Sequence, residues 1–223
     1  GKVTLRALGL EYKQYTVIYN GVDCQRFRDL GMPRHPAEIV LSGFISRRKG
    51  IFELLRAYAK TWQTRPDATL TLVGSLPNGD LRDELFARFK EIVPGAARSQ
   101  VNFVGRVAHQ SMPEYYNQAS LVVFPSLAEA FGLSCAEAMA CGTPVIMTDG
   151  ASGPELIENG VSGLLVDVED TDAFSRAILR LLGNERLRSE MGRNGRERVL
   201  SNFNSEITAL QNLEYYQRVT GKA

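Results

Sequence analysis

Short apolar runs alternate along the chain with longer segments in which apolar residues recur every three or four positions. The short runs are continuous, with no alternation of polar and apolar residues, which is typical of strands that are buried on both faces of a sheet. We therefore predict strands at residues 39–41, 68–73, 101–104, 121–124, 144–147 and 164–166.

The longer segments predict helices between the strands. Ile51, Leu54, Leu55, Tyr58 and Trp62 are spaced as one buried helical face. Similar patterns predict helices over 81–93, 112–118, 133–141, 174–182, 187–200 and 203–213. Strands separated by helices imply right-handed crossovers and hence a parallel sheet. The predicted fold is α/β, a Rossmann-like doubly wound parallel sheet with C-terminal helices, and its ligand should lie at the carboxyl ends of the strands.

Composition and charge argue against several classes of protein and give no sign of a second domain. The 223 residues contain 26 Lys and Arg against 25 Asp and Glu, a formal net charge of +1, which argues against a general nucleic-acid binder. The three cysteines form no CxxC pair, which argues against a disulfide framework or a metal site. The sequence contains no run of 18 consecutive apolar residues, so it predicts no membrane-spanning helix. A reducing, cytoplasmic setting is the expected environment.

The first candidate for chemistry is the segment from Gly43 to Gly50, which follows one predicted strand and opens a helix. Backbone amides and the positive end of a helix dipole would lie there at the strand ends. Arg47, Arg48 and Lys49 add three cations to the same segment. This combination suits a diphosphate, and a solvated basic turn explains the composition equally well.

The second candidate follows the fourth predicted strand, where a helix opens near Gly132. The amides of Phe131, Gly132 and Leu133 would be free donors in the first turn. Glu129 precedes this turn, and Glu137 returns to its face one turn beyond Leu133. Carboxylates accept hydrogen bonds from sugar hydroxyls, so the segment suggests a ligand with phosphate and polyol parts. The alternative interpretation is a loop charge at Glu129 and an exposed helix residue at Glu137.

The order of several short motifs resembles one known family. Glu129 and Glu137 form the E-x7-E motif of retaining GT-B glycosyltransferases of the glycogen-synthase-like "glycosyl transferases group 1" class. Other segments in the family's order are 19–23 with Phe27 (YNGVD and F), 49–50 (KG), 103–105 (FVG), 116–119 (YNQA), 124–126 (FPS), 142–145 (GTPV) and 160–166 (GVSGLLV). Each motif alone is weak, but their joint order covers nearly the whole chain and is specific.

The resemblance implies a two-domain enzyme whose active site lies in the cleft between two Rossmann-like halves. These motifs belong to the C-terminal, donor-binding half, so we expect residues 1–223 to form a nucleotide-sugar-binding domain and the N-terminal, acceptor-binding half to be missing. A helix over 203–219 should cross to that half. The fragment should be inactive without it.

For the reaction, the resemblance implies retaining, metal-independent transfer of a hexose from a UDP- or GDP-linked sugar. The nucleotide-sugar is a substrate, so no cofactor is expected. The acceptor would be a saccharide or a lipid-linked molecule, as in polysaccharide biosynthesis. The protein would then lie in the cytoplasm, or peripherally at the inner face of the membrane.

The family's functional residues carry over position by position. Glu129 should be the catalytic residue that faces the transferred sugar, and Glu137 should hold the ribose hydroxyls. Lys49 should contact the diphosphate. The other donor-binding positions are Gly43, Gly74, Arg47 and Arg48, the amides of Phe131, Gly132 and Leu133 beside the phosphates or the sugar, and Arg106 with Val107 beside the base.

The chain departs from the family pattern at two places. The family's Gly-Gly before Pro-Glu is Ala151-Ser152 here, although Pro154 and Glu155 remain. The arginine that follows the first loop glycine, and usually pairs with the diphosphate, is Phe44 here. Arg47 or Arg48 could substitute for it, but a degenerate, non-catalytic module that scaffolds a partner transferase is a competing hypothesis. The E-x7-E spacing argues against a sugar-nucleotide epimerase. The sequence also lacks the glycine fingerprint of a dinucleotide-binding module. His109, in the loop past the third predicted strand, is expected to be solvated.

Overall fold

The computed structural model describes residues 16–150 and 152–221, so the first fifteen residues of the predicted domain lie outside this part. Six parallel strands form one sheet there, in the order β3-β2-β1-β4-β5-β6. They are β1 (Glu38–Ser42), β2 (Thr69–Val73), β3 (Val101–Gly105), β4 (Leu121–Phe124), β5 (Val145–Thr148) and β6 (Leu164–Val166). The predicted Rossmann-like α/β sheet is confirmed, because each continuous apolar run is a strand covered on both faces.

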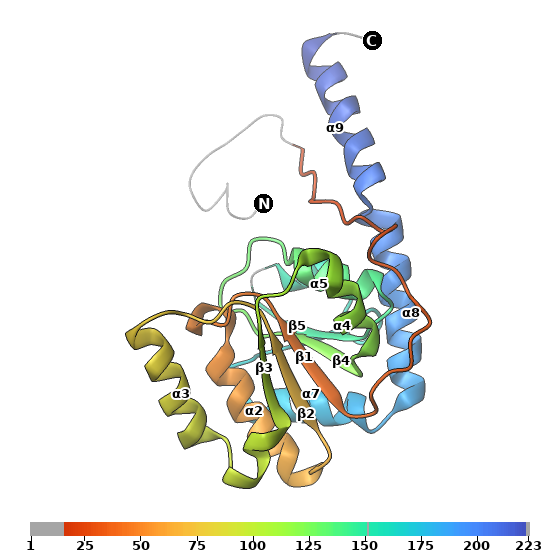
Figure 1. The fold of residues 1–223 in the computed structure, drawn as a ribbon. Helices are drawn as coiled ribbons and strands as arrows, with labels where there is room; N and C mark the ends of the chain where they lie inside the picture. The colour runs from red at the N-terminus through yellow and green to blue at the C-terminus, as the bar shows by residue number, and fades with distance from the viewer. Residues whose placement is uncertain (1–15, 151, 222–223) are drawn as a thin grey trace.

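Helices cover both faces of the sheet (Figure 1). One face is covered by α2 (Ile51–Thr64), α3 (Asp80–Ile92) and α7 (Thr171–Leu182). The opposite face is covered by α4 (Met112–Gln118) and α5 (Leu133–Ala140), and α8 (Glu185–Asn202) packs against α5. Short helical turns complete this part of the chain, namely η1 (Arg47–Lys49), η2 (Gly95–Gln100), η3 (His109–Ser111) and α6 (Gly153–Leu156).

The α2 helix shows how the sequence pattern becomes packing. Ile51, Leu54, Leu55 and Tyr58 are all buried, as predicted from their spacing. Burial of a large apolar side chain contributes roughly 1.5–3 kcal/mol to stability, so this face anchors the helix on the sheet. Trp62 was predicted on the same face but is only partly buried, and its indole Nε1 donates to Gln100 Oε1 at 2.5 Å.

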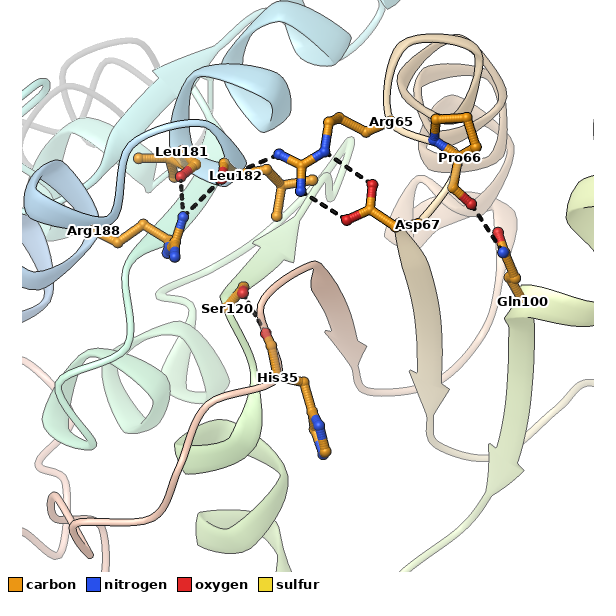
Figure 2. Close-up of polar contacts among 9 residues, drawn as sticks. All are labelled: His35, Arg65, Pro66, Asp67, Gln100, Ser120, Leu181, Leu182 and Arg188. Carbon is orange, nitrogen blue, oxygen red and sulfur yellow. Dashed lines mark hydrogen bonds and ion pairs between the residues drawn. The ribbon is translucent and has the colours of Figure 1, made fainter.

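Beyond the amino ends of the strands, Arg65 and Arg188 donate hydrogen bonds to carbonyls at the end of α7 (Figure 2). Arg188 donates to the carbonyls of Leu181 and Leu182 at 2.7 and 2.8 Å. Arg65 donates to the Leu182 carbonyl and pairs with Asp67. These carbonyls belong to the last turn of α7, beyond which the helix supplies no further amides, and the Leu181 carbonyl also accepts from the Asn184 amide at 3.2 Å. The contacts therefore tie α2, α7 and α8 together and serve the fold.

The strand order reverses between β1 and β4, which pair with each other although β2 and β3 lie between them in the sequence. The chain runs from β1 to β2 on one side of this point and from β4 to β5 on the other side. In open parallel sheets, ligands bind beyond the carboxyl ends of the strands at such a reversal. A ligand site is therefore expected just beyond Ser42, which ends β1, and Phe124, which ends β4.

The last helix, α9 (Ser205–Thr220), extends away from the sheet and has no buried residue along its described length (Figure 1). Leu210, Leu213, Tyr216 and Val219 are between 54% and 63% exposed on it. Phe203, which we grouped with this helix, precedes it and packs inside the domain. Within residues 16–150 and 152–221, no helix is both long and apolar enough to cross a membrane.

Candidate functional site

Two adjoining cavities open at the carboxyl ends of β1 and β4. The large cavity has a volume of about 680 Å³ and extends from β1 to η3. The small cavity has about 150 Å³ and lies between Lys49 of η1 and the start of α5. Ser42, Leu133 and Ser134 line both cavities, so the two form one continuous site. Their size and position suit a small-molecule ligand.

Gly43 and Gly74 form the wall of the large cavity where β1 and β2 end. Their φ angles are 123° and 152°, backbone conformations that favour glycine. The Gly43 amide donates to the Val73 carbonyl, and the Gly74 amide donates to the Gly105 carbonyl. A Cβ on Gly74 would lie 1.7 Å from the Gly43 carbonyl oxygen. The two glycines therefore let neighbouring strand ends touch and keep side chains out of this wall.

The start of α5 presents backbone amides to the small cavity. Gly132 precedes the helix with a φ of 93° and no side-chain cap. Its carbonyl accepts hydrogen bonds from the amides of Cys135 and Ala136. The amides of Phe131, Gly132 and Leu133 donate to no group within the described part of the chain. Such free amides, together with the helix dipole, favour an anion at this point.

Lys49 and Glu129 meet across the small cavity. Lys49 Nζ lies 2.5 Å from Glu129 Oε2, and the two side chains are 25% and 18% exposed. Burial by itself raises the pKa of Glu129, but the hydrogen bond and charge of Lys49, helped by the Ala130 amide, hold that pKa below its ordinary value. The carboxylate is therefore ionised at neutral pH, with a cation beside it.

The other two predicted cations lie outside the cavities. Arg47 and Arg48 have exposed side chains on η1 and line neither cavity. Of the three cations expected to face the ligand, the structure brings Lys49 to the site. Phe131, predicted to donate its amide, lines neither cavity, and its buried ring stacks on Tyr19 with centroids 5.7 Å apart.

Glu137 lines the large cavity from α5 and is 5% exposed. The alternative interpretation of Glu137 as an exposed helix residue is therefore wrong. His109 Nε2 lies 2.9 Å from Glu137 Oε1. Burial raises the pKa of Glu137, and the hydrogen bond with His109 opposes that effect. His109 was expected to be solvated; its side chain is 56% exposed, but it belongs to the site, and nothing in its local sequence signals a partner 28 positions away.

The rest of the large cavity combines exposed and buried side chains. Arg106 and Val107 line it from the loop after β3, which is the segment predicted to lie beside a base. Phe44, at the position of the missing arginine, is 50% exposed in the cavity wall. Ser42 and Tyr116 were not predicted as site residues, and their hydroxyl oxygens lie 2.9 Å apart. Burial raises the pKa of Tyr116, so its phenol stays neutral and available for hydrogen bonding.

The arrangement defines a Rossmann-like domain whose two cavities suit a ligand with both phosphate and hydroxyl groups. The small cavity offers Lys49 and free amides, which suit an anion, and the large cavity offers the Glu137 carboxylate, which suits hydroxyl donors. In residues 16–150 and 152–221, no three metal-ligating side chains are grouped in a way that could hold an ion.

The chain matches the model of the glycosyl transferases group 1 family over residues 25–198, and it belongs to this family. A D-inositol 3-phosphate glycosyltransferase of Nocardioides sp. is 31% identical over 220 residues, which cover 91% of this chain and 48% of the relative. A glycogen synthase of Mycobacterium tuberculosis is 30% identical over 206 residues, with the same two shares. The chain spans about half the length of the curated relatives it matches.

Solved structures share the fold. Sucrose-phosphate synthase from Thermosynechococcus elongatus matches 100% of this chain and 57% of its own, with a TM-score of 0.87 and 33% identity. The C-terminal domain of a glycosyl transferase group 1 family protein from Francisella tularensis matches 82% of this chain and 99% of its own, with a TM-score of 0.72 and 28% identity. Anabaena HepE in complex with UDP matches 97% of this chain and 61% of its own, with a TM-score of 0.86 and 24% identity. The chain has the fold of the C-terminal, Rossmann-like half of a GT-B glycosyltransferase.

Proposed function

We propose that this chain is the donor-binding domain of a retaining, metal-independent hexosyltransferase and that it binds a UDP- or GDP-linked sugar. The observation that carries the proposal is the convergence of Lys49, the free amides of α5 and the buried carboxylate of Glu137 at the strand-order reversal. Anabaena HepE has this fold and forms a complex with UDP, which supports the proposal. The nucleotide-sugar is the substrate, so the reaction requires no separate cofactor.

The two cavities would divide the donor between them. The ribose would present its hydroxyls to Glu137 in the large cavity, with the base along Arg106 and Val107. The diphosphate would lie against Lys49 and the first-turn amides of α5 in the small cavity. The volumes of about 680 and 150 Å³ are consistent with a nucleoside in the first and a compact anionic group in the second.

Catalysis would act on the charges that develop during transfer. As the bond between sugar and diphosphate breaks, negative charge grows on the leaving phosphate, and Lys49 with the amides of Gly132 and Leu133 would stabilise it. The sugar carbon becomes oxocarbenium-like in the same step. Glu129, held ionised beside Lys49, would face the transferred sugar and accept from its hydroxyls. Because the lysine and the amides supply the positive charge, this scheme needs no metal ion.

The acceptor would bind to a second, N-terminal half of the enzyme. α9 (Ser205–Thr220) would cross to that half, and its exposed apolar residues suit such packing. The donor domain alone would then be inactive. We place the whole enzyme in the cytoplasm, or peripherally at the inner membrane face, where it would act on a saccharide or lipid-linked acceptor in polysaccharide biosynthesis.

Isothermal titration calorimetry of this chain with UDP, GDP and ADP tests the donor site. We expect at least one of them to bind, and Glu137→Ala to weaken that binding by roughly 1–3 kcal/mol through loss of a charged acceptor. Glu84→Ala, at an exposed position of α3, is the control and should bind as the wild type does. A folded chain that binds none of the three contradicts the donor site. Unchanged affinity in Glu137→Ala removes Glu137 from the ribose contact.

One observation favours a second hypothesis, a non-catalytic module that scaffolds a partner transferase. Phe44 stands where the family has an arginine, is 50% exposed in the cavity wall, and cannot pair with a diphosphate. The test is sugar transfer by the full-length protein. Retained turnover excludes the scaffold, whereas an inactive protein that still binds a partner enzyme supports it.

A further inference from the structure

The imidazole of His109 is held in place although it is more than half exposed. His109 begins η3, and the Ser111 amide closes this turn on the Ala108 carbonyl at 2.9 Å. The His109 ring packs on Phe27 with centroids 5.1 Å apart. Its Nε2 lies 2.9 Å from Glu137 Oε1. The backbone, the ring and Nε2 of His109 therefore all have partners, and the residue lines the large cavity.

Without a partner, the Glu137 carboxyl group would be a poor acceptor of hydrogen bonds from hydroxyl groups. Its side chain is 7% exposed, and burial raises its pKa because the charged form loses hydration. A protonated carboxyl would donate from one oxygen, whereas a carboxylate accepts at both. The angle of its terminal torsion, χ3, also has a broad distribution, so a carboxylate without a partner would not hold its oxygens in one orientation.

His109 counters both difficulties. Donation from its Nε2 to Oε1 favours the ionised carboxylate, and Arg26 adds a smaller favourable charge, while Tyr116 beside Glu137 stays neutral. The same bond fixes one carboxylate oxygen. The other, Oε2, accepts from no group among residues 16–150 and 152–221.

We propose that His109 is a positioning residue of the donor site, which keeps Glu137 ionised and oriented so that its free oxygen accepts from the ribose hydroxyls. The inference rests on the proposed function, because Glu137 must be the ribose contact. His109 itself needs no contact with the donor. Through Glu137 it makes the site prefer a ribonucleotide to an analogue without the hydroxyls.

Calorimetry with two nucleotides tests this role. The first is UDP, or whichever of GDP and ADP binds the wild type, and the second is its 2′,3′-dideoxy analogue. His109→Leu removes the donor and should weaken ribonucleotide binding about tenfold, the equivalent of one hydrogen bond. The same variant should bind the dideoxy analogue as the wild type does, because that analogue offers Glu137 no hydroxyls. His109→Gln retains an N–H donor and should recover most of the lost affinity.

His35 is the matched control because it is the other of the two histidines. It lies at the amino edge of the sheet, at the opposite end of β1 from the site, where its carbonyl accepts from Ser120 Oγ. Figure 2 shows the His35 ring pointing away from Ser120. His35→Leu should leave both affinities unchanged. Thermal unfolding of each variant separates a binding loss from a folding loss, and His109→Asn, with a shorter side chain, replaces His109→Leu if the latter does not fold.

The outcomes separate the two proposals. An equal loss for both nucleotides, or no loss for either, overturns the positioning role of His109 and leaves the donor site standing. A folded wild-type chain that binds none of the nucleotides overturns the donor site and this inference with it. A loss confined to the ribonucleotide, with recovery in His109→Gln, supports the inference.

Discussion

Lys49 Nζ lies 2.5 Å from Glu129 Oε2, although the two residues are 80 positions apart in the sequence. Each side chain is about a quarter exposed or less, and an unpaired charge in such a place would be costly. The pair keeps the Glu129 carboxylate ionised beside the free amides of α5. A cation for phosphate and a carboxylate for sugar hydroxyls are thus held together at one point of the proposed donor site.

Replacing Lys49 by Met should weaken binding of a nucleoside diphosphate by roughly 1.5–3 kcal/mol, the contribution of a hydrogen bond to a charged group. Binding of the nucleoside alone should change little, because it has no phosphate to lose a partner. Calorimetry with UDP and uridine measures both. Lys60→Met is the control, since Lys60 forms an exposed pair with Asp172, away from the two cavities. Equal losses for UDP and uridine would contradict a phosphate contact at Lys49.

The ion pair also predicts a pH dependence of stability. The pKa of Glu129 is lowered in the folded state, so its charge stabilises the fold above the unfolded pKa of about 4.3. This contribution is lost as the pH falls through the folded pKa. Glu129→Gln should therefore lower the free energy of unfolding by about 1 kcal/mol at pH 7, and the difference from wild type should shrink below about pH 4.

Urea denaturation at a series of pH values measures that difference. Glu84→Gln, at an exposed position of α3, serves as the control and should follow the wild type at every pH. If the gap between Glu129→Gln and the wild type stays constant down to acid pH, the ionised carboxylate is not what stabilises the fold.

Gly74→Ala should destabilise the domain by at least about 3 kcal/mol, because its Cβ would lie 1.7 Å from the Gly43 carbonyl oxygen. Gly105→Ala is the matched control at the end of the neighbouring strand, since Gly105 has a φ of 82° and open space where a Cβ would lie. Gly105→Ala should lower the free energy of unfolding by only about 1–2 kcal/mol, the backbone strain of a side chain at a positive φ. Thermal or urea unfolding compares the two, and similar losses would show that the close approach of the strand ends is not tight.

The elements that the sequence predicted well are those with a strong local signal. The six strands follow from continuous apolar runs. The helix predicted over 174–182 is α7, which begins three residues earlier, at Thr171, because the Asp170 carboxylate caps the amides of Asp172 and Ala173. The signal fails where an element is short or an amphipathic side chain ends a pattern. α6 has too few residues for a helical period, and Trp62 at the end of its stripe stays partly exposed to reach Gln100.

The candidate site divides in the same way. Glu129, Glu137 and Lys49 were predicted from motif order, and the structure brings all three to the two cavities. Ser42 was not predicted, because it is a single polar position at the end of an apolar run. Tyr116 was noted only as part of the YNQA motif, and nothing in that motif signals that its hydroxyl meets Ser42, 74 positions away. The sequence could not tell which cation of the 47–49 segment faces the site, since all three lie within one short turn.

The sequence by itself determined a doubly wound parallel sheet, the loops that carry the chemistry and the family of the chain, because apolar runs, helical periodicity and motif order are properties of the linear chain. Only the tertiary structure decided that Lys49 faces Glu129 while Arg47 and Arg48 face solvent, and that His109 reaches Glu137. These contacts join positions 80 and 28 residues apart. The first contact exists because the sheet order places β4 beside β1, so the loops that follow these strands meet. The second exists because η3, which carries His109, lies against α4, and α4 packs on α5, which carries Glu137.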